Sequence, residues 1–261
     1  MWIRSPCAMS ETLLSGALAV PAVGREHFPT TFIRTAVCEL RFPVLFELEG
    51  PKPPLSFAQA VRKEYPIAER AQGIELTDPK LEQKTHHSFR SKGGHWSIVL
   101  KSSSASLETH RYGGFEDFEE RIRELIKALS TFIDSDFFTR IGIRYTNFLP
   151  YDRATVAEWI NPALVAPLAS GELGEAQAYS GQIRGAIDLG TTPGGYLLQH
   201  GIQRDEGKPA TYAVDMDFYA EVVDVSDSLA VINKLHTRQY DLFRWAVGPK
   251  AIEALRKGRG H

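Results

Sequence analysis

Apolar and polar residues alternate most clearly in a stretch near the middle of the chain, residues 137–149. The alternation has the period of two that is typical of a β-strand, in which successive side chains point to opposite faces. The apolar positions are Phe137, Ile141, Ile143 and Tyr145, and the polar ones are Arg140, Gly142, Arg144 and Thr146. We therefore expect a central strand with one buried face and one polar face.

Two long segments carry the spacing of an amphipathic helix. In residues 115–132 the apolar positions recur every three or four residues, and charged residues occupy the opposite side. Residues 227–247 repeat this spacing and follow Ser226, a favourable residue type for the start of a helix. Shorter helical segments are predicted at 57–65 and at 155–168, and Pro162 and Pro167 divide the second. We expect the helices to pack on the apolar face of the sheet.

Seven further segments have strand character, and turn residues separate several of them. These segments are 32–48, with a bend at Pro43, then 86–92, 95–101, 107–112, 179–189, 196–204 and 211–221. The polar residues between 66 and 85 include Thr77, Asp78 and Pro79, and they predict a loop.

The order of the predicted elements repeats. Residues 31–136 read as strand, helix, three strands and helix, and residues 137–250 give the same βαβββα order, which indicates an internal duplication within one continuous domain. Residues 1–30 predict a flexible N-terminal tail, and 251–261 a basic tail. The predicted fold is α+β, with one curved antiparallel sheet and helices on one face. This saddle-like plan resembles the TATA-box-binding protein in topology alone, which implies nothing about function.

Composition and charge narrow the class of protein. The chain has 261 residues and a formal net charge of −2, which disfavours a broad surface for nucleic acid. Its two cysteines, Cys7 and Cys38, form no metal-binding motif, and we expect a reducing cytoplasm. No apolar run reaches the roughly 20 residues that span a bilayer. Residues 13–23 are mildly apolar but interrupted by small residues, so a tail is favoured over a signal peptide.

A set of short motifs resembles a known family. In chain order they are Ala36-Val37-Cys38-Glu39-Leu40-Arg41-Phe42, Trp96, Tyr112 with Phe118, Gly142-Ile143-Arg144-Tyr145-Thr146-Asn147, and Leu235-His236. The set is similar to a sporadically distributed family of uncharacterised bacterial proteins, over residues 31–247. Phe32-Ile33-Arg34 stands where that family has a Pro-Pro-Ile-like entry, so the N-terminal edge departs from it. The resemblance implies a bacterial cytoplasmic protein, and it implies no activity, substrate or catalytic residue.

The polar face of the predicted sheet is the candidate site. Because strand side chains alternate, the face opposite the helices collects charged residues of both signs. The candidate binding residues are Arg41, His95, Arg140, Arg144, Arg184, Asp215 and Asp217. Arg144 is the expected anchor, since its planar guanidinium binds a carboxylate or phosphate through two hydrogen bonds. The alternative is a solvated surface with cross-strand ion pairs, each worth only ~0.2–1 kcal/mol.

Residue types that carry catalysis or bind metal occur, but without a matching motif. Asp215 and Asp217 share a strand face at a spacing that suits a divalent cation, yet no third acidic ligand is placed beside them, and pairing with arginine is favoured. Four histidines, His86, His87, His95 and His110, lie along three adjacent predicted strands, where alternation separates His86 from His87. No nucleophile elbow, metalloprotease motif or phosphate-binding loop is present. We expect neither a metal nor a cofactor.

These observations favour a non-enzymatic bacterial binding or regulatory protein that recognises a protein partner or a small polar ligand. Two alternatives remain open. One is a saddle protein that binds nucleic acid, although both signs of charge on the face and the absence of interleaved aromatic residues count against it. Its cationic residues would be Arg41, Lys101, Arg140, Arg144 and Arg184. The other is an enzyme with a site built on Arg144, His95 and Asp215.

Overall fold

The chain forms two compact units in the computed structural model, which describes residues 16–50, 52–77, 80–172, 174 and 176–258. Each unit is assembled from segments that are distant in the sequence. Unit 1 comprises Met1–Ile33, Thr146–Ala220 and Lys234–His261, and unit 2 comprises Arg34–Tyr145 and Glu221–Asn233.

Nine strands make up the sheet, and their pairings are antiparallel, which confirms the predicted α+β class. The strands are β1 Ile33–Arg41, β2 Ile67–Thr77, β3 Lys80–Arg90, β4 Trp96–Lys101, β5 Ser104–Thr109, β6 Phe137–Pro150, β7 Ser180–Ala186, β8 Gly194–Gln203 and β9 Thr211–Asp224. Their order in the sheet is β2-β3-β4-β5-β1-β6-β9-β8-β7. The sequence placed eight of these strands, but two bounds differ. The strand predicted at 32–48 ends at Arg41, before Pro43, which cannot donate to a strand pairing, and Phe46–Glu49 forms a short 3₁₀ helix instead. Strand β3 begins at Lys80 rather than at residue 86.

The helices follow the predicted spacing. They are η2 Phe46–Glu49, α2 Leu55–Val61, α3 Phe115–Leu129, α4 Val156–Trp159, α5 Pro162–Ala169, η3 Val225–Asp227, α6 Ser228–Ala246 and α7 Pro249–Lys257. The helical segment predicted at 155–168 is divided before Pro162, as expected, whereas Pro167 lies within α5 and does not divide it. Asn161 interrupts the segment, because its side chain accepts a hydrogen bond from Ala163 N at 2.9 Å and caps the second piece. Helix α7 occupies most of the predicted basic tail.

Residues 66–85, which the sequence predicted as a loop, contain β2 and the first part of β3. The two strands pair from Ile67↔Arg90 to Thr77↔Lys80, and β2 lies at one edge of the sheet. An edge hairpin satisfies its backbone groups by pairing and needs no alternating apolar pattern, so this pattern could not reveal it. The first half of the chain therefore has one strand more than the predicted βαβββα order.

The two halves nevertheless share a connection order. In the first half β1 lies beside β5, followed by β4 and β3; in the second half β6 lies beside β9, followed by β8 and β7. In both, the first strand of the half neighbours its last strand. This agreement is what a duplication leads one to expect, and the duplication itself stays a prediction.

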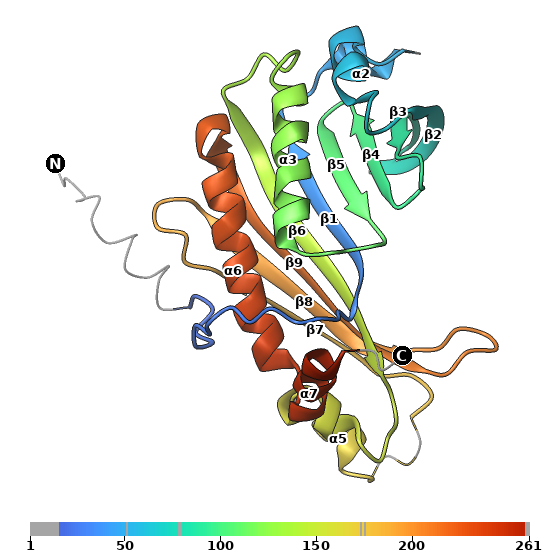
Figure 1. The fold of residues 1–261 in the computed structure, drawn as a ribbon, viewed down its shortest axis with the longest axis vertical. Coiled ribbons are helices and arrows are strands. Elements are labelled where there is room, and N and C mark those ends of the chain that lie inside the picture. The colour runs from blue at the N-terminus through green and yellow to red at the C-terminus, as the bar shows by residue number, and fades with distance from the viewer. Residues whose placement is uncertain (1–15, 51, 78–79, 173, 175, 259–261) are drawn as a thin grey trace, which may run out of the picture. The chain divides into compact units, whose positions relative to one another are not determined.

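One face of the unit 2 strands forms a core with α3, which runs across β1 and β5 in Figure 1. Phe118 of α3 is fully buried, with ring centroids 6.0 Å from Trp96 and 6.1 Å from Tyr145. Such aromatic contacts add about 0.5–1.5 kcal/mol each beyond burial. At the start of β6 the buried residue is Phe138 rather than the expected Phe137. Ser135 holds Phe137 at the strand entrance, since its hydroxyl bonds both the backbone N and O of Phe137.

The core of unit 1 is organised in the same way around β9. Tyr212, Val214, Met216 and Phe218 alternate along this strand and are buried. From α6, the buried Gln239 donates through Nε2 to the carbonyl oxygen of Met216 at 2.6 Å. The alternate residues of β9 form the other face of the strand, where Asp215 and Asp217 lie.

Candidate functional site

The polar face of the unit 2 strands is built from the residues that alternate with the buried ones. On β1, Glu39 and Arg41 alternate with the buried Cys38 and Leu40, and on β6 the exposed Arg144 lies between buried Ile143 and Tyr145. We call this surface the open face of unit 2. It comprises Val37, Glu39 and Arg41 of β1, Ser97, Val99 and Lys101 of β4, Ser104, Ser106 and Glu108 of β5, and Arg140 and Arg144 of β6, and of these Ser104 is buried.

A shared carboxylate holds two of the predicted arginines in place. Glu39 Oε2 accepts from Arg41 Nε at 2.8 Å and from Arg140 Nη1 at 3.2 Å. The guanidinium of Arg140 lies over Gly142, where an added Cβ would come within 2.6 Å of Nη1. The Arg140 side chain is only 18% exposed, whereas that of Arg41 is 51% exposed. The Arg140 side chain thus lies flat against the sheet, whereas the Arg41 side chain extends into solvent.

Glycine at position 142 has a steric reason in this geometry. Any side chain there would displace the Arg140 guanidinium from the sheet surface. The glycine of the Gly-Ile-Arg-Tyr-Thr-Asn segment therefore allows the bond between Arg140 and Glu39 to form.

The histidines predicted along the first strands do not converge on one site. His95 is exposed in the turn before β4, and its carbonyl oxygen accepts from Thr109 Oγ1 at 3.0 Å. His87 is 3% exposed, and burial lowers its pKa below the usual range, which favours the neutral imidazole. His110 Nε2 lies 3.1 Å from Glu108 Oε1.

The remaining predicted residues belong to unit 1. Asp215 Oδ1 accepts from the Thr146 hydroxyl at 3.3 Å. Asp217 is half-buried on the same side of β9, and Arg184 is exposed on β7, the edge strand. The candidate set is therefore divided: Arg41, His95, Arg140 and Arg144 belong to unit 2, and Arg184, Asp215 and Asp217 to unit 1. Across the described part of the chain, no three His, Cys, Asp or Glu residues gather in a way that suits a metal ion.

A second polar site in unit 1 lies outside the candidate set. Residues 17–30, part of the predicted flexible tail, are bonded to α6, α7 and β7, while residues 1–15 lie outside the described residues. Leu18 N donates to Ala186 O at 2.9 Å, and Leu18 O accepts from Arg238 Nη2 at 2.8 Å. Val23 N donates to the buried Asp241 at 3.0 Å. We call residues 17–30 the N-terminal strap.

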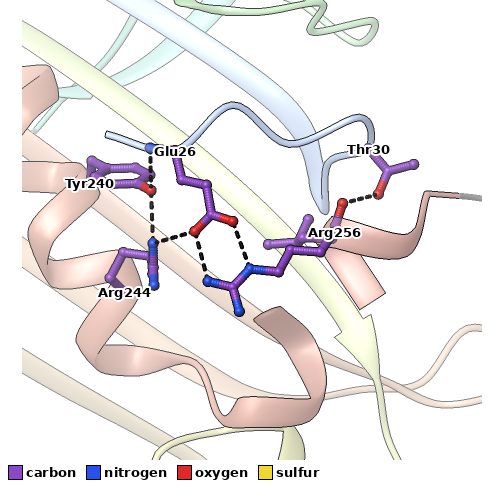
Figure 2. Close-up of polar contacts among 6 residues, drawn as sticks. Glu26, Thr30, Tyr240, Arg244 and Arg256 are labelled. Carbon is purple, nitrogen blue, oxygen red and sulfur yellow. Dashed lines mark hydrogen bonds and ion pairs between the residues drawn. The ribbon is translucent and has the colours of Figure 1, made fainter. Parts of the chain in front are cut away.

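Glu26 is the most strongly bonded side chain of the strap (Figure 2). Its carboxylate accepts two hydrogen bonds from Arg256, from Nε at 2.6 Å and from Nη2 at 2.9 Å, and a third from Arg244 Nη1 at 3.4 Å. The Tyr240 hydroxyl accepts from Glu26 N at 3.2 Å and from Arg244 Nη1 at 3.0 Å. The hydrogen bonds from Arg256 lower the pKa of Glu26, with smaller contributions from both positive charges.

The strap was missed because its contacts join residues more than 200 positions apart and follow no periodic pattern. The only signal in the sequence is that Glu26 is acidic while the C-terminal helices carry several arginines. Net charge alone cannot pair these residues.

Comparison with known proteins identifies no relative of this chain. No family model matches the sequence, and no curated protein matches it. Within the described residues, no helix combines the length and apolar character that a membrane crossing requires.

The strap should loosen when Arg256 is replaced by alanine, because Glu26 then loses its two-point partner. We expect limited digestion with trypsin to cleave after Arg25 several-fold faster in Arg256→Ala than in the wild type. Lys257→Ala is the matched control, since it removes the same charge one residue further along, from a lysine bonded to Glu253 of its own helix. Equal cleavage rates in both variants and the wild type would contradict a strap held by Arg256.

Acid should destabilise the fold partly through His236 of α6. Burial, with a smaller contribution from the positive charge of Arg25, lowers the pKa of His236 to about 3. The unfolded chain, with a histidine pKa near 6.5, takes up a proton that the folded chain excludes, so stability is complete above pH 6.5 and falls between pH 6.5 and 3. At pH 5 the loss is about 2 kcal/mol.

Denaturant unfolding at pH 7 and pH 5 checks this expectation. His236→Gln cannot titrate, so its loss of stability between the two pH values should be smaller than that of the wild type. Identical losses in the two proteins would show that His236 does not contribute.

Proposed function

We propose that the protein is a non-enzymatic binding or regulatory protein of the bacterial cytoplasm, and that the open face of unit 2 recognises a protein partner or a polar ligand. The observation that carries the proposal is the pair of arginines fixed by Glu39 beside the exposed Arg144. Charged donors that are already oriented bind with less loss of side-chain entropy than mobile ones.

The face has the character of a recognition surface. Between the charged residues lie the small, half-buried hydroxyl side chains of Ser97 and Ser106, which leave room for a partner to approach the sheet. Arg144 lies on β6, within the sheet rather than on a loop, so its backbone position is fixed by strand pairing. Its planar guanidinium is suited to two-point binding of a carboxylate or phosphate.

The alternative enzyme site draws no support from this arrangement. It would need Arg144, His95 and Asp215 to act on one substrate. His95 belongs to a turn, and the carboxylate of Asp215 accepts a hydrogen bond from Thr146.

Nucleic-acid binding is the other alternative, and the charge pattern disfavours it. Arg41, Arg140 and Lys101 lie on the open face together with the carboxylates of Glu39 and Glu108. Contacts with a nucleic-acid backbone depend on neutralising successive phosphates, and interspersed carboxylates oppose this. Of the proposed cationic set, Arg184 belongs to unit 1.

The test uses the immobilised full chain to capture partners from an extract of the native bacterium, followed by affinity measurements with the purified partner. Arg144→Ala should weaken binding by about tenfold or more, the usual effect of losing charge-assisted hydrogen bonds. Its free energy of unfolding should change by less than about 1 kcal/mol, as for an exposed charged residue.

Arg123→Ala is the matched control, because Arg123 is 49% exposed in the same unit but lies on α3. It should bind the partner like the wild type. Wild-type affinity in Arg144→Ala, or an equal loss in both variants, would refute the proposal. Single- and double-stranded nucleic acid, nucleotides and metal ions are titrated in parallel, and tight binding of any of these in place of a protein would favour an alternative function.

A further inference from the structure

We propose that part of the open face is a binding site for the carboxylates of an acidic segment in a partner protein. This site, the Arg41 site, consists of Lys101, Ser104, Arg41 and Arg140. The inference rests on the proposed function in that it specifies the chemistry of the partner. A separate observation supports it, namely the register of the neighbouring strands β4, β5 and β1.

The register places three of these residues in one row across the sheet. Lys101 of β4 pairs with Ser104 of β5, and Ser104 pairs with Arg41 of β1. Neighbouring strands are about 4.8 Å apart, so the Cα atoms of Lys101 and Arg41 are separated by roughly 10 Å. Both residues lie on the open face with the serine between them. Ser104 itself is buried, so a ligand would contact the long side chains of Lys101 and Arg41 on either side of it rather than the serine.

The guanidinium of Arg41 is oriented by its bond to Glu39. This bond uses Nε, at 2.8 Å, and the side chain is 51% exposed. The two terminal nitrogens of a guanidinium form a second donor edge, which has the geometry of a carboxylate. Glu39 thus fixes Arg41 by one edge while the exposed side chain offers the other.

The local charge favours an anion although the chain is slightly acidic overall. The row of Arg41 and the adjacent row of Glu39, Ser106 and Val99, together with Arg140, contain three cations and one carboxylate among the described side chains. The formal net charge of the chain is −2. The excess of positive charge is therefore a property of this part of the sheet.

The spacing and the interspersed acids favour a protein segment over a nucleic acid. In an extended peptide, side chains two residues apart are about 7 Å apart and point the same way. The long side chains of Lys101 and Arg41 can converge from their wider backbone separation on two such carboxylates. Glu108 lies one row beyond Glu39 and would oppose a continuous chain of phosphates. The carboxylates of a peptide are spaced apart, so they can bind Arg41 and Lys101 without lying beside Glu39 or Glu108.

The experiment titrates the purified full chain with a short fluorescent poly-glutamate peptide at low salt. Poly-glutamine of equal length, inorganic phosphate and duplex DNA are compared with it. We expect poly-glutamate to bind and poly-glutamine not to bind, with affinity falling as salt rises. Arg41→Ala and Lys101→Ala should each weaken binding by about tenfold, and Arg41→Lys by less.

Glu39→Gln distinguishes a binding site from a structural ion pair. In Glu39→Gln the amide oxygen can still accept from Arg41 and keep it oriented, while the negative charge that opposes the ligand is removed. Poly-glutamate binding should therefore strengthen several-fold. Arg123→Ala should have no effect. Melting curves establish that each variant is folded. If Glu39→Gln does not fold, Arg41→Lys still tests the site.

Three results would overturn the inference: no binding of poly-glutamate, equal binding by Arg41→Ala, or tighter binding of duplex DNA than of the peptide at the same salt. The proposed function fails separately. A captured partner that needs Arg144 but tolerates Arg41→Ala would refute the Arg41 site alone, whereas poly-glutamate binding without any partner dependent on Arg144 would refute the function alone.

Discussion

The pleat of the strands is the constraint on which the structure depends. Along β1 and β6, a shift of one residue in register would exchange the core face for the open face and expose Cys38, Leu40 and Ile143. The aromatic contacts of Phe118 with Trp96 and Tyr145 fix this register from the helix side. The same pleat gathers arginines and hydroxyl groups on the other side, so the core and the candidate site are two results of one alternation.

Charge on the open face is arranged by a few local bonds rather than by net charge. Glu39 joins β1 to β6 by accepting from Arg41 and Arg140, and Gly142 provides the space for the Arg140 guanidinium. Each bond is partly exposed and contributes little to stability. Their effect is to hold the donors in a fixed orientation, which matters for binding more than for folding.

Periodicity allowed much of the fold to be predicted. Helices α3 and α6 and the alternation of β6 depend on residues close in sequence, so the α+β class and one buried face followed directly. Strand β2 and the N-terminal strap could not be predicted in this way. The first is held by backbone pairing at a sheet edge, and the second by bonds such as that between Glu26 and Arg256. Neither leaves a periodic pattern in the sequence.

For the candidate site, the alternation predicts only which face of its strand each residue occupies. Alternation placed Arg41 and Arg144 on the open face, where the structure has them. It could not show that Glu39 is shared by two arginines, because that depends on the distance between side chains on different strands. It also could not show that Asp215 and Asp217 belong to a different unit, because units follow from contacts between segments distant in sequence.

The central claim, that neighbouring residues of β6 serve the core and the open face, is tested most directly by two adjacent substitutions. The free energy of unfolding is measured for Ile143→Ala and Arg144→Ala by denaturant titration. We expect Ile143→Ala to lose about 2–5 kcal/mol, since a fully buried side chain leaves a cavity. Arg144→Ala should lose less than about 1 kcal/mol. Equal losses, or a larger loss for Arg144→Ala, would contradict the assignment of the two faces.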